Sequence, residues 1–162
     1  MIKIVPDALS KLLTDLIGRP VAATPGPPAS DLVGLGGSSG VAAIYRDPEG
    51  AASAACVADI AAAASLGAAL SLMPAAQAKA CVKSGELSEN LMENYGEVCN
   101  VIASLIGQLT HKSASLDGVQ SGAGAPTEDV RRLLANGGAR LDVNIRVEGY
   151  DDGRVTLLVN AG

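Results

Sequence analysis

One long periodic segment, residues 87–109, constrains the fold of this chain more than any other feature. Apolar side chains recur along it at steps of three and four residues: Leu87, Leu91, Tyr95, Val98, Ile102, Leu105 and Leu109. Positions at these steps share one face of a helix, so the segment predicts a long amphipathic helix. The apolar face of such a helix has to be buried against a sheet or other helices, which the rest of the chain must provide.

Further helices are indicated on both sides of this segment. Residues 6–18 show the same spacing and end in a glycine, and the Ala-rich residues 59–73 predict another helix. A short helix is expected over residues 74–85, because proline suits the first helical turn and glycine suits a helix end. Thr127 is expected to cap a last short helix over residues 128–136.

Two hairpins are expected from the runs of alternating and β-branched residues. The first covers residues 41–58 with a turn at residues 47–50, where proline and glycine hold favoured turn positions. The second covers residues 140–160 with a turn at residues 150–153, which read Tyr-Asp-Asp-Gly. Further extended segments are expected at residues 20–23 and 112–119, and a loop at residues 24–40.

The order of these elements predicts one α+β domain over residues 1–162. A succession of helix, strand, loop and hairpin occurs twice, over residues 6–73 and 86–160, which indicates an internal duplication. We expect antiparallel sheet with the two long helices packed on one side of it.

Composition and charge argue against several classes of function. The net charge is −5 and the largest basic cluster is the pair Arg131–Arg132, which argues against nucleic acid or an anionic membrane as partner. The chain shows no signal peptide and no apolar stretch long enough to span a membrane, and its three cysteines lack metal-site spacing. We therefore expect a cytoplasmic protein with free thiols and no metal site.

A polar stripe lies on the long helix, nearly opposite its apolar face. Glu93, Glu97, Asn100 and Ser104 are separated by steps of three and four, so their side chains are expected to emerge together. The spacing Glu93-x-x-x-Glu97-x-x-Asn100 resembles the signature of the CheC/CheX/FliY family of response-regulator phosphatases. The order of the other elements is similar too, from the first helix ending in LIGRPV to the closing hairpin.

The resemblance implies a CheX-like domain with an internally duplicated fold and one active site. The substrate would be the aspartyl phosphate of a response-regulator receiver domain, which supplies its own Mg²⁺, so this chain would bind no cofactor. Asn100 would orient the attacking water, and Glu97 would dock against a lysine of the receiver. Glu93 and Ser104 would contact the partner.

The sequence departs from the family pattern at three places. Glu93 stands where Asp or Ser is usual, and Ala123 stands where the family carries a proline on the following strand. The first helix, residues 7–17, has no Glu and no Asn, which leaves one site per chain.

Other interpretations stay open at this point. The stripe is also typical of a solvated helix face, and the departures favour a non-catalytic binding or scaffold module of the same family. A homodimer through the strand at residues 155–159 is a further hypothesis. The Gly-rich residues 34–40 lack a phosphate-loop spacing, and His111 has no metal-ligating neighbours in the sequence.

Overall fold

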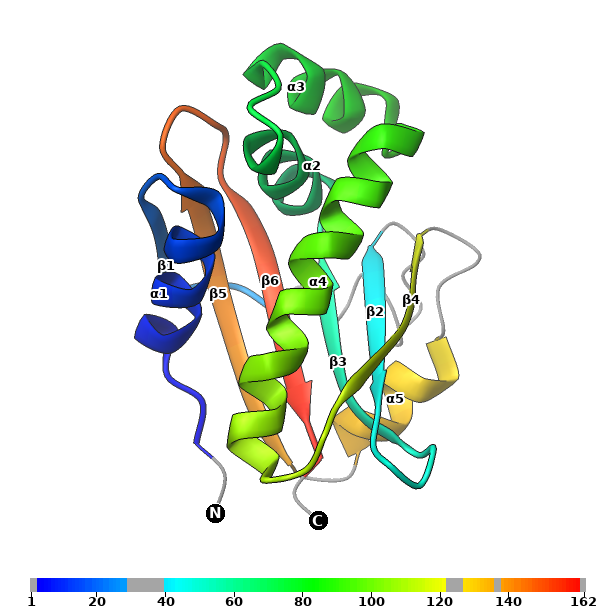
Figure 1. Cartoon of the computed structure of the whole chain (residues 1–162). Coiled ribbons are helices and arrows are strands. Elements are labelled where there is room, and N and C mark those ends of the chain that lie inside the picture. The colour runs from blue at the N-terminus through cyan, green and yellow to red at the C-terminus, as the bar shows by residue number, and fades with distance from the viewer. Residues whose placement is uncertain (1–2, 29–39, 122–126, 136–137, 161–162) are drawn as a thin grey trace.

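The computed structural model describes residues 3–28, 40–121, 127–135 and 138–160, and within them six antiparallel strands form one sheet (Figure 1). The strands are β1 (Val21–Pro25), β2 (Val41–Arg46), β3 (Ala52–Ala58), β4 (Ser115–Ser121), β5 (Ala139–Val147) and β6 (Gly153–Val159). The α+β class and the antiparallel sheet predicted from the sequence are confirmed.

The strand order β1-β5-β6-β3-β2-β4 interleaves the two parts of the chain. The hairpins β2–β3 and β5–β6 meet at the centre, where β3 pairs with β6. Residues 155–159 of β6 are thus paired on both sides, so the hypothesis that this strand forms a dimer through a free sheet edge is wrong. Strand β1 pairs with the second hairpin through β5, and β4 pairs with the first hairpin through β2. The order is thus symmetric about the central pair, while the two halves at residues 6–73 and 86–160 stay a prediction.

Helices cover both faces of the sheet. On one face lie α1 (Pro6–Ile17), α2 (Ile60–Leu70) and α4 (Glu89–Thr110), with α3 (Ala75–Ser84) packed outside α2 (Figure 1). On the other face α5 (Thr127–Ala135) covers part of β2, β3 and β6. Strand β2 is buried on both sides because it lies between these layers, which explains why its sequence is apolar without alternation.

Small residues let α2 pack closely against the neighbouring helices and the sheet. Residues 62–69 of this helix are all buried, and a Cβ on Gly67 would lie 2.9 Å from the carbonyl oxygen of Leu91 in α4. At the start of the helix Asp59 caps the amide of Ala62 at 2.8 Å, and Gly153 packs directly against Ala62. The sequence therefore uses alanine and glycine to bring helices and sheet unusually close.

The turn of the second hairpin differs from the sequence prediction. The amide of Tyr150 donates to the carbonyl of Val147 at 2.9 Å, and Gly149 has a φ of 90°. The predicted turn at residues 150–153 is therefore wrong, and the reversal uses Glu148 and Gly149 instead, because glycine suits the positive φ. Hydrogen bonds from Arg146 and Asn144 hold Asp152 and lower its pKa.

Candidate functional site

The site predicted from the sequence lies on α4, whose two ends are fixed by local structure. The Ser88 hydroxyl accepts the amide of Leu91 at 3.3 Å and caps the first turn, while His111 takes a left-handed conformation with φ of 58° and ends the helix. The inner face buries these residues: Leu91, Tyr95, Val98, Cys99, Ile102, Ala103, Leu105 and Ile106. The amphipathic helix predicted from residues 87–109 is confirmed.

The four residues of the polar stripe are all exposed on the outer side of α4. Ser104 donates its hydroxyl to the carbonyl of Val101 at 2.7 Å, which turns it back toward its own helix. Among the residues that the structure describes, none forms a hydrogen bond or ion pair with the side chains of Glu97 and Asn100. Both side chains are therefore available to a bound molecule.

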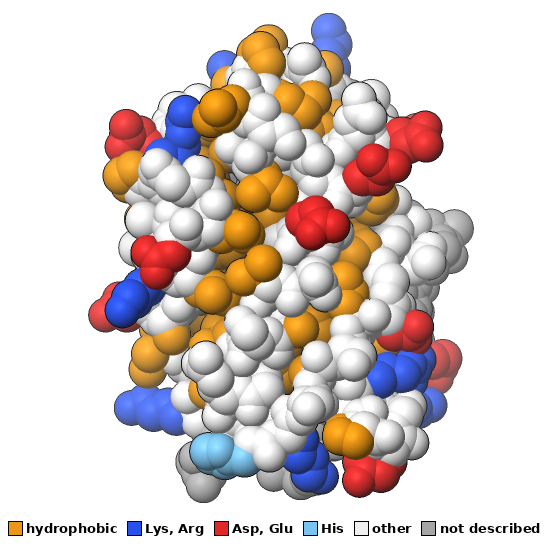
Figure 2. Space-filling model, viewed as in Figure 1, with side chains coloured by type: hydrophobic (Ala, Val, Ile, Leu, Met, Phe, Trp, Pro, Cys, Tyr) orange, Lys and Arg blue, Asp and Glu red, His pale blue; other side chains and the backbone are white. Residues whose placement is uncertain are grey.

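A groove of about 490 Å³ runs between α4 and the edge strand β4. Figure 2 shows this face of the molecule, where hydrophobic side chains flank the helix and charged ones are sparse. Gly96 widens the groove, because a Cβ there would meet nothing within 4 Å. The residues that line it are Met92, Glu93, Gly96, Glu97, Asn100, Leu116, Gly118 and Val119. The groove thus combines apolar walls with three polar side chains of the stripe.

The wall made by β4 has an irregular shape. Along the β2–β4 ladder Ala43 pairs with Val119 but Tyr45 pairs with Leu116, so β4 has one extra residue between these pairs. Gly118 lies in this bulge with φ of 82°, a conformation that glycine adopts without strain. The bulge bends β4 beside the groove, and the sequence prediction of an extended segment at residues 112–119 did not include it.

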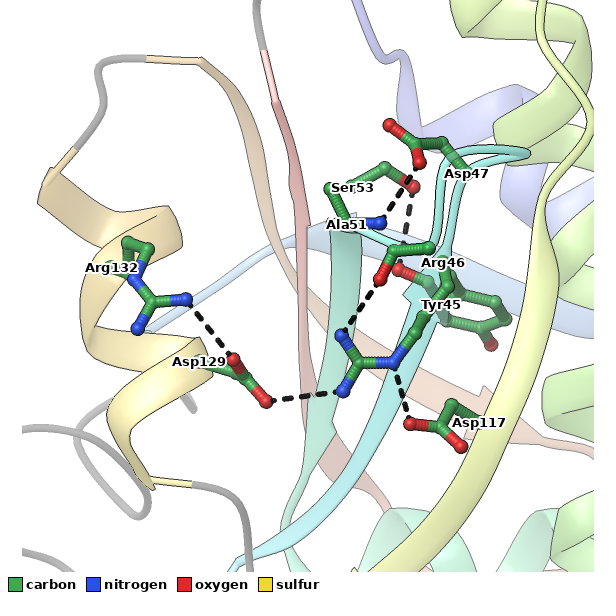
Figure 3. Close-up of polar contacts among 9 residues, drawn as sticks. Tyr45, Arg46, Asp47, Ala51, Ser53, Asp117, Asp129 and Arg132 are labelled. Carbon is green, nitrogen blue, oxygen red and sulfur yellow. Dashed lines mark hydrogen bonds and ion pairs between the residues drawn. The ribbon is translucent and has the colours of Figure 1, made fainter.

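An ion-pair network holds β4 at this bulge (Figure 3). The guanidinium of Arg46 on β2 lies 2.7 Å from a carboxylate oxygen of Asp117 and 3.7 Å from one of Asp129 on α5. Arg132 of α5 in turn lies 3.5 Å from Asp129. The network links an edge strand, its neighbour and the helix on the opposite face of the sheet.

Two tyrosines and two cysteines are buried beneath the site. The hydroxyl of Tyr45 on β2 donates to the carbonyl oxygen of Cys99 on α4 at 2.6 Å, and the hydroxyl of Tyr95 lies 3.8 Å from the sulfur of Cys56. Burial raises the pKa of both tyrosines and of Cys99 well above their usual values, and that of Cys56 to about 11. All four groups are therefore protonated near neutral pH. A buried, protonated thiol is a poor nucleophile, so Cys56 and Cys99 are unreactive.

Sequence reasoning did not identify Tyr45 or Arg46. The sequence contains only weak indications of their role. Tyr45 is one of three aromatic residues in the chain, and Arg46 is a charged residue at the end of an apolar strand. The reading of the cysteines as free thiols is confirmed, since Cys56, Cys81 and Cys99 are all free and buried.

Neither a metal site nor a membrane span is found within the described residues. There, no group of three or more His, Cys, Asp or Glu side chains is placed to hold a metal ion. No described helix is long and apolar enough to cross a membrane. Several earlier predictions lie outside the described residues: Ala123, the cap by the Thr127 side chain, and residues 29–39 of the predicted loop, which include most of its Gly-rich segment.

Comparison with known proteins identifies the fold. No family model and no curated protein matches the sequence. Among solved structures, the FliM middle domain of H. pylori matches with a TM-score of 0.60 and 9% identity, covering 96% of this chain and 84% of that one. FliY of Thermotoga maritima matches with a TM-score of 0.55 and 12% identity, covering 94% and 82%.

A third match comes from the CheX-CheY complex of Borrelia burgdorferi with BeF3 and Mg²⁺. Its TM-score is 0.51 at 17% identity, and it covers 95% of this chain and 94% of that one. The fold expected from the CheC/CheX/FliY resemblance is confirmed, and at such low identity the likeness extends to the fold alone.

Proposed function

We propose that this protein hydrolyses the aspartyl phosphate of a response-regulator receiver domain, with Glu97 and Asn100 as the reactive pair. The observation that supports the proposal most is the placement of these two side chains. They lie one turn apart on an exposed helix face, at the edge of a groove with apolar walls, and no described residue engages them. The fold shared with CheX gives a second, coarser support.

The proposed reaction requires few groups from this chain. A phosphoryl group on a receiver aspartate is already held beside a Mg²⁺ ion and a lysine of the receiver, so hydrolysis needs an in-line water. The Asn100 amide both donates and accepts hydrogen bonds, which suits it to orient that water. The Glu97 carboxylate suits an ion pair with the receiver lysine, which would fix the docking geometry.

The groove supplies the contact that such docking requires. Met92, Leu116 and Val119 offer apolar area on either side of the stripe, and Glu93 adds a negative charge at its edge. A receiver domain that covers this face would bury apolar surface around the phosphoryl group and exclude bulk water from it. Ser104 lies one turn beyond Asn100 and would contact the partner at the border of the interface.

The proposal is tested by dephosphorylation of receiver domains from the same genome. Each receiver is phosphorylated, and phosphate release is followed in Mg²⁺ with wild type, Asn100→Ala, Glu97→Ala and Gln108→Ala as control. Gln108 is an exposed amide on the same helix but lies outside the groove between α4 and β4. We expect Asn100→Ala to lower kcat by roughly 100-fold, because orientation of the water is lost. Glu97→Ala should mainly raise KM, and Gln108→Ala should change neither.

A second candidate function is a binding or scaffold module without catalysis. The matching FliM structures favour it, since two of them are complexes of FliM with FliG and with SpeE. The same experiment separates the candidates. A receiver that binds the protein but loses phosphate no faster in its presence, with every variant folded, would contradict the phosphatase and support the scaffold.

A further inference from the structure

Tyr45 on β2 contacts the helix that carries the site from the side of the sheet. On β2 it shares with Val41 and Ala43 the face that α4 covers, and its side chain is completely buried. Its hydroxyl donates to the carbonyl oxygen of Cys99 at 2.6 Å. Cys99 directly precedes Asn100, so a side chain from the sheet holds the backbone of α4 at the turn that presents the reactive pair.

The same residue also adjoins the opposite wall of the groove. In the β2–β4 ladder Tyr45 pairs with Leu116, which lines the groove. Its neighbour Arg46 holds Asp117 at 2.7 Å, at the start of the bulge. Tyr45 is therefore connected to the helix wall of the groove by a hydrogen bond and to the strand wall by strand pairing.

The hydrogen bond is not needed to satisfy the Cys99 carbonyl. That carbonyl lies inside α4, where the helical pattern provides it with the amide four residues later, and its second lone pair is free to accept the tyrosine. The bond therefore fixes the position of α4 relative to β2 and is not needed for the helix to form. Burial raises the pKa of Tyr45 well above its usual value, so the hydroxyl remains a donor at every pH near neutrality.

We infer that Tyr45 is a positioning residue for the proposed reaction: through the Cys99 carbonyl, its hydroxyl fixes the turn of α4 from which Asn100 orients the attacking water. The inference rests on the proposed function. Water orientation depends on distances of a fraction of an ångström, whereas docking is spread over many contacts along the groove. Loss of the hydroxyl should therefore affect turnover more than binding.

The test compares Tyr45→Phe with wild type and with Tyr95→Phe. Tyr95 is the matched control because it is also completely buried, and its hydroxyl contacts the thiols of Cys56 and Cys99 rather than the Cys99 carbonyl that accepts from Tyr45. We expect Tyr45→Phe to lower kcat roughly tenfold. Its KM, and its Kd for a receiver loaded with beryllium fluoride and Mg²⁺, should stay within about twofold of wild type, since docking contacts are unchanged. Tyr95→Phe should retain the wild-type kcat.

Each outcome decides the matter. The assays are run at a temperature at which circular dichroism shows all three proteins to be folded. An active wild type with an unchanged kcat in Tyr45→Phe overturns the positioning role and leaves the proposed function intact. Equal losses of kcat in both variants show a general structural effect and also overturn it. A wild type that hydrolyses no phosphorylated receiver contradicts the proposed function, and the positioning role with it.

Discussion

At the scale of single residues, the buried thiol of Cys56 makes stability depend on alkaline pH. Burial raises its pKa from 9.0 to about 11, so between these values the unfolded chain has lost a proton that the folded protein keeps. The contribution to stability is complete below pH 9 and is lost as the pH rises toward 11. The buried hydroxyls of Tyr45 and Tyr95 act in the same direction.

We predict that the free energy of unfolding falls by up to about 1.4 kcal/mol per pH unit for this one group. Urea denaturation at pH 8, 9 and 10 measures the slope, with Cys56→Ala as the comparison. The variant should be less stable at pH 8 but should lose less stability on going to pH 10. Parallel curves for the two proteins would show that Cys56 does not contribute to the pH dependence.

At the scale of elements, two helical glycines should respond in opposite ways to the same substitution. Gly67 of α2 faces α4, and a Cβ there would lie 2.9 Å from the Leu91 carbonyl oxygen, so Gly67→Ala must push the helices apart. Gly96 of α4 opens into the groove, where a Cβ meets nothing within 4 Å. We expect Gly67→Ala to destabilise the protein by about 1–2 kcal/mol, and Gly96→Ala to stabilise it by about 0.5–1 kcal/mol.

Thermal and urea unfolding of both variants measure these changes. Stabilisation by Gly67→Ala would contradict the role of Gly67 in the close packing of α2 against α4. Because Gly96 lines the groove, its variant also shows whether a single methyl group there weakens the binding of a receiver domain that we propose for this groove.

The elements show where prediction from sequence succeeds and where it ends. The helix α4 is predictable because one periodic pattern runs through its whole length, and the stripe of Glu97 and Asn100 follows from the same geometry. The turn between β5 and β6 is not predictable in this way. Asp-Asp-Gly and Glu-Gly both favour turns, and the pairing of β5 with β6 decides between them. The bulge at Gly118 and the contact of Tyr45 with Cys99 depend on segments far apart in the chain, which no local pattern contains.

At the scale of the whole molecule, the interleaved sheet makes the two parts of the chain depend on each other. Strand β1 pairs with β5 across the middle of the sequence, and β4 pairs with β2. The core on the α4 side takes side chains from both parts, from Leu9 and Tyr45 to Ile106 and Val155. Cutting the chain between α3 and α4 would therefore expose β1, α2 and the apolar face of α4 at once.

We predict that residues 1–85 and 86–162 do not fold when they are produced separately, although each begins with a helix and a strand and contains one hairpin. Each fragment would keep one hairpin but lose the partner of its edge strand and the opposite half of the core, and small domains with so little buried surface are marginal. Circular dichroism and amide exchange of each fragment, with the intact chain as control, measure this. The intact chain should unfold in one cooperative transition by calorimetry. A cooperative transition in either isolated fragment would contradict the prediction and show that a half is a folding unit in its own right.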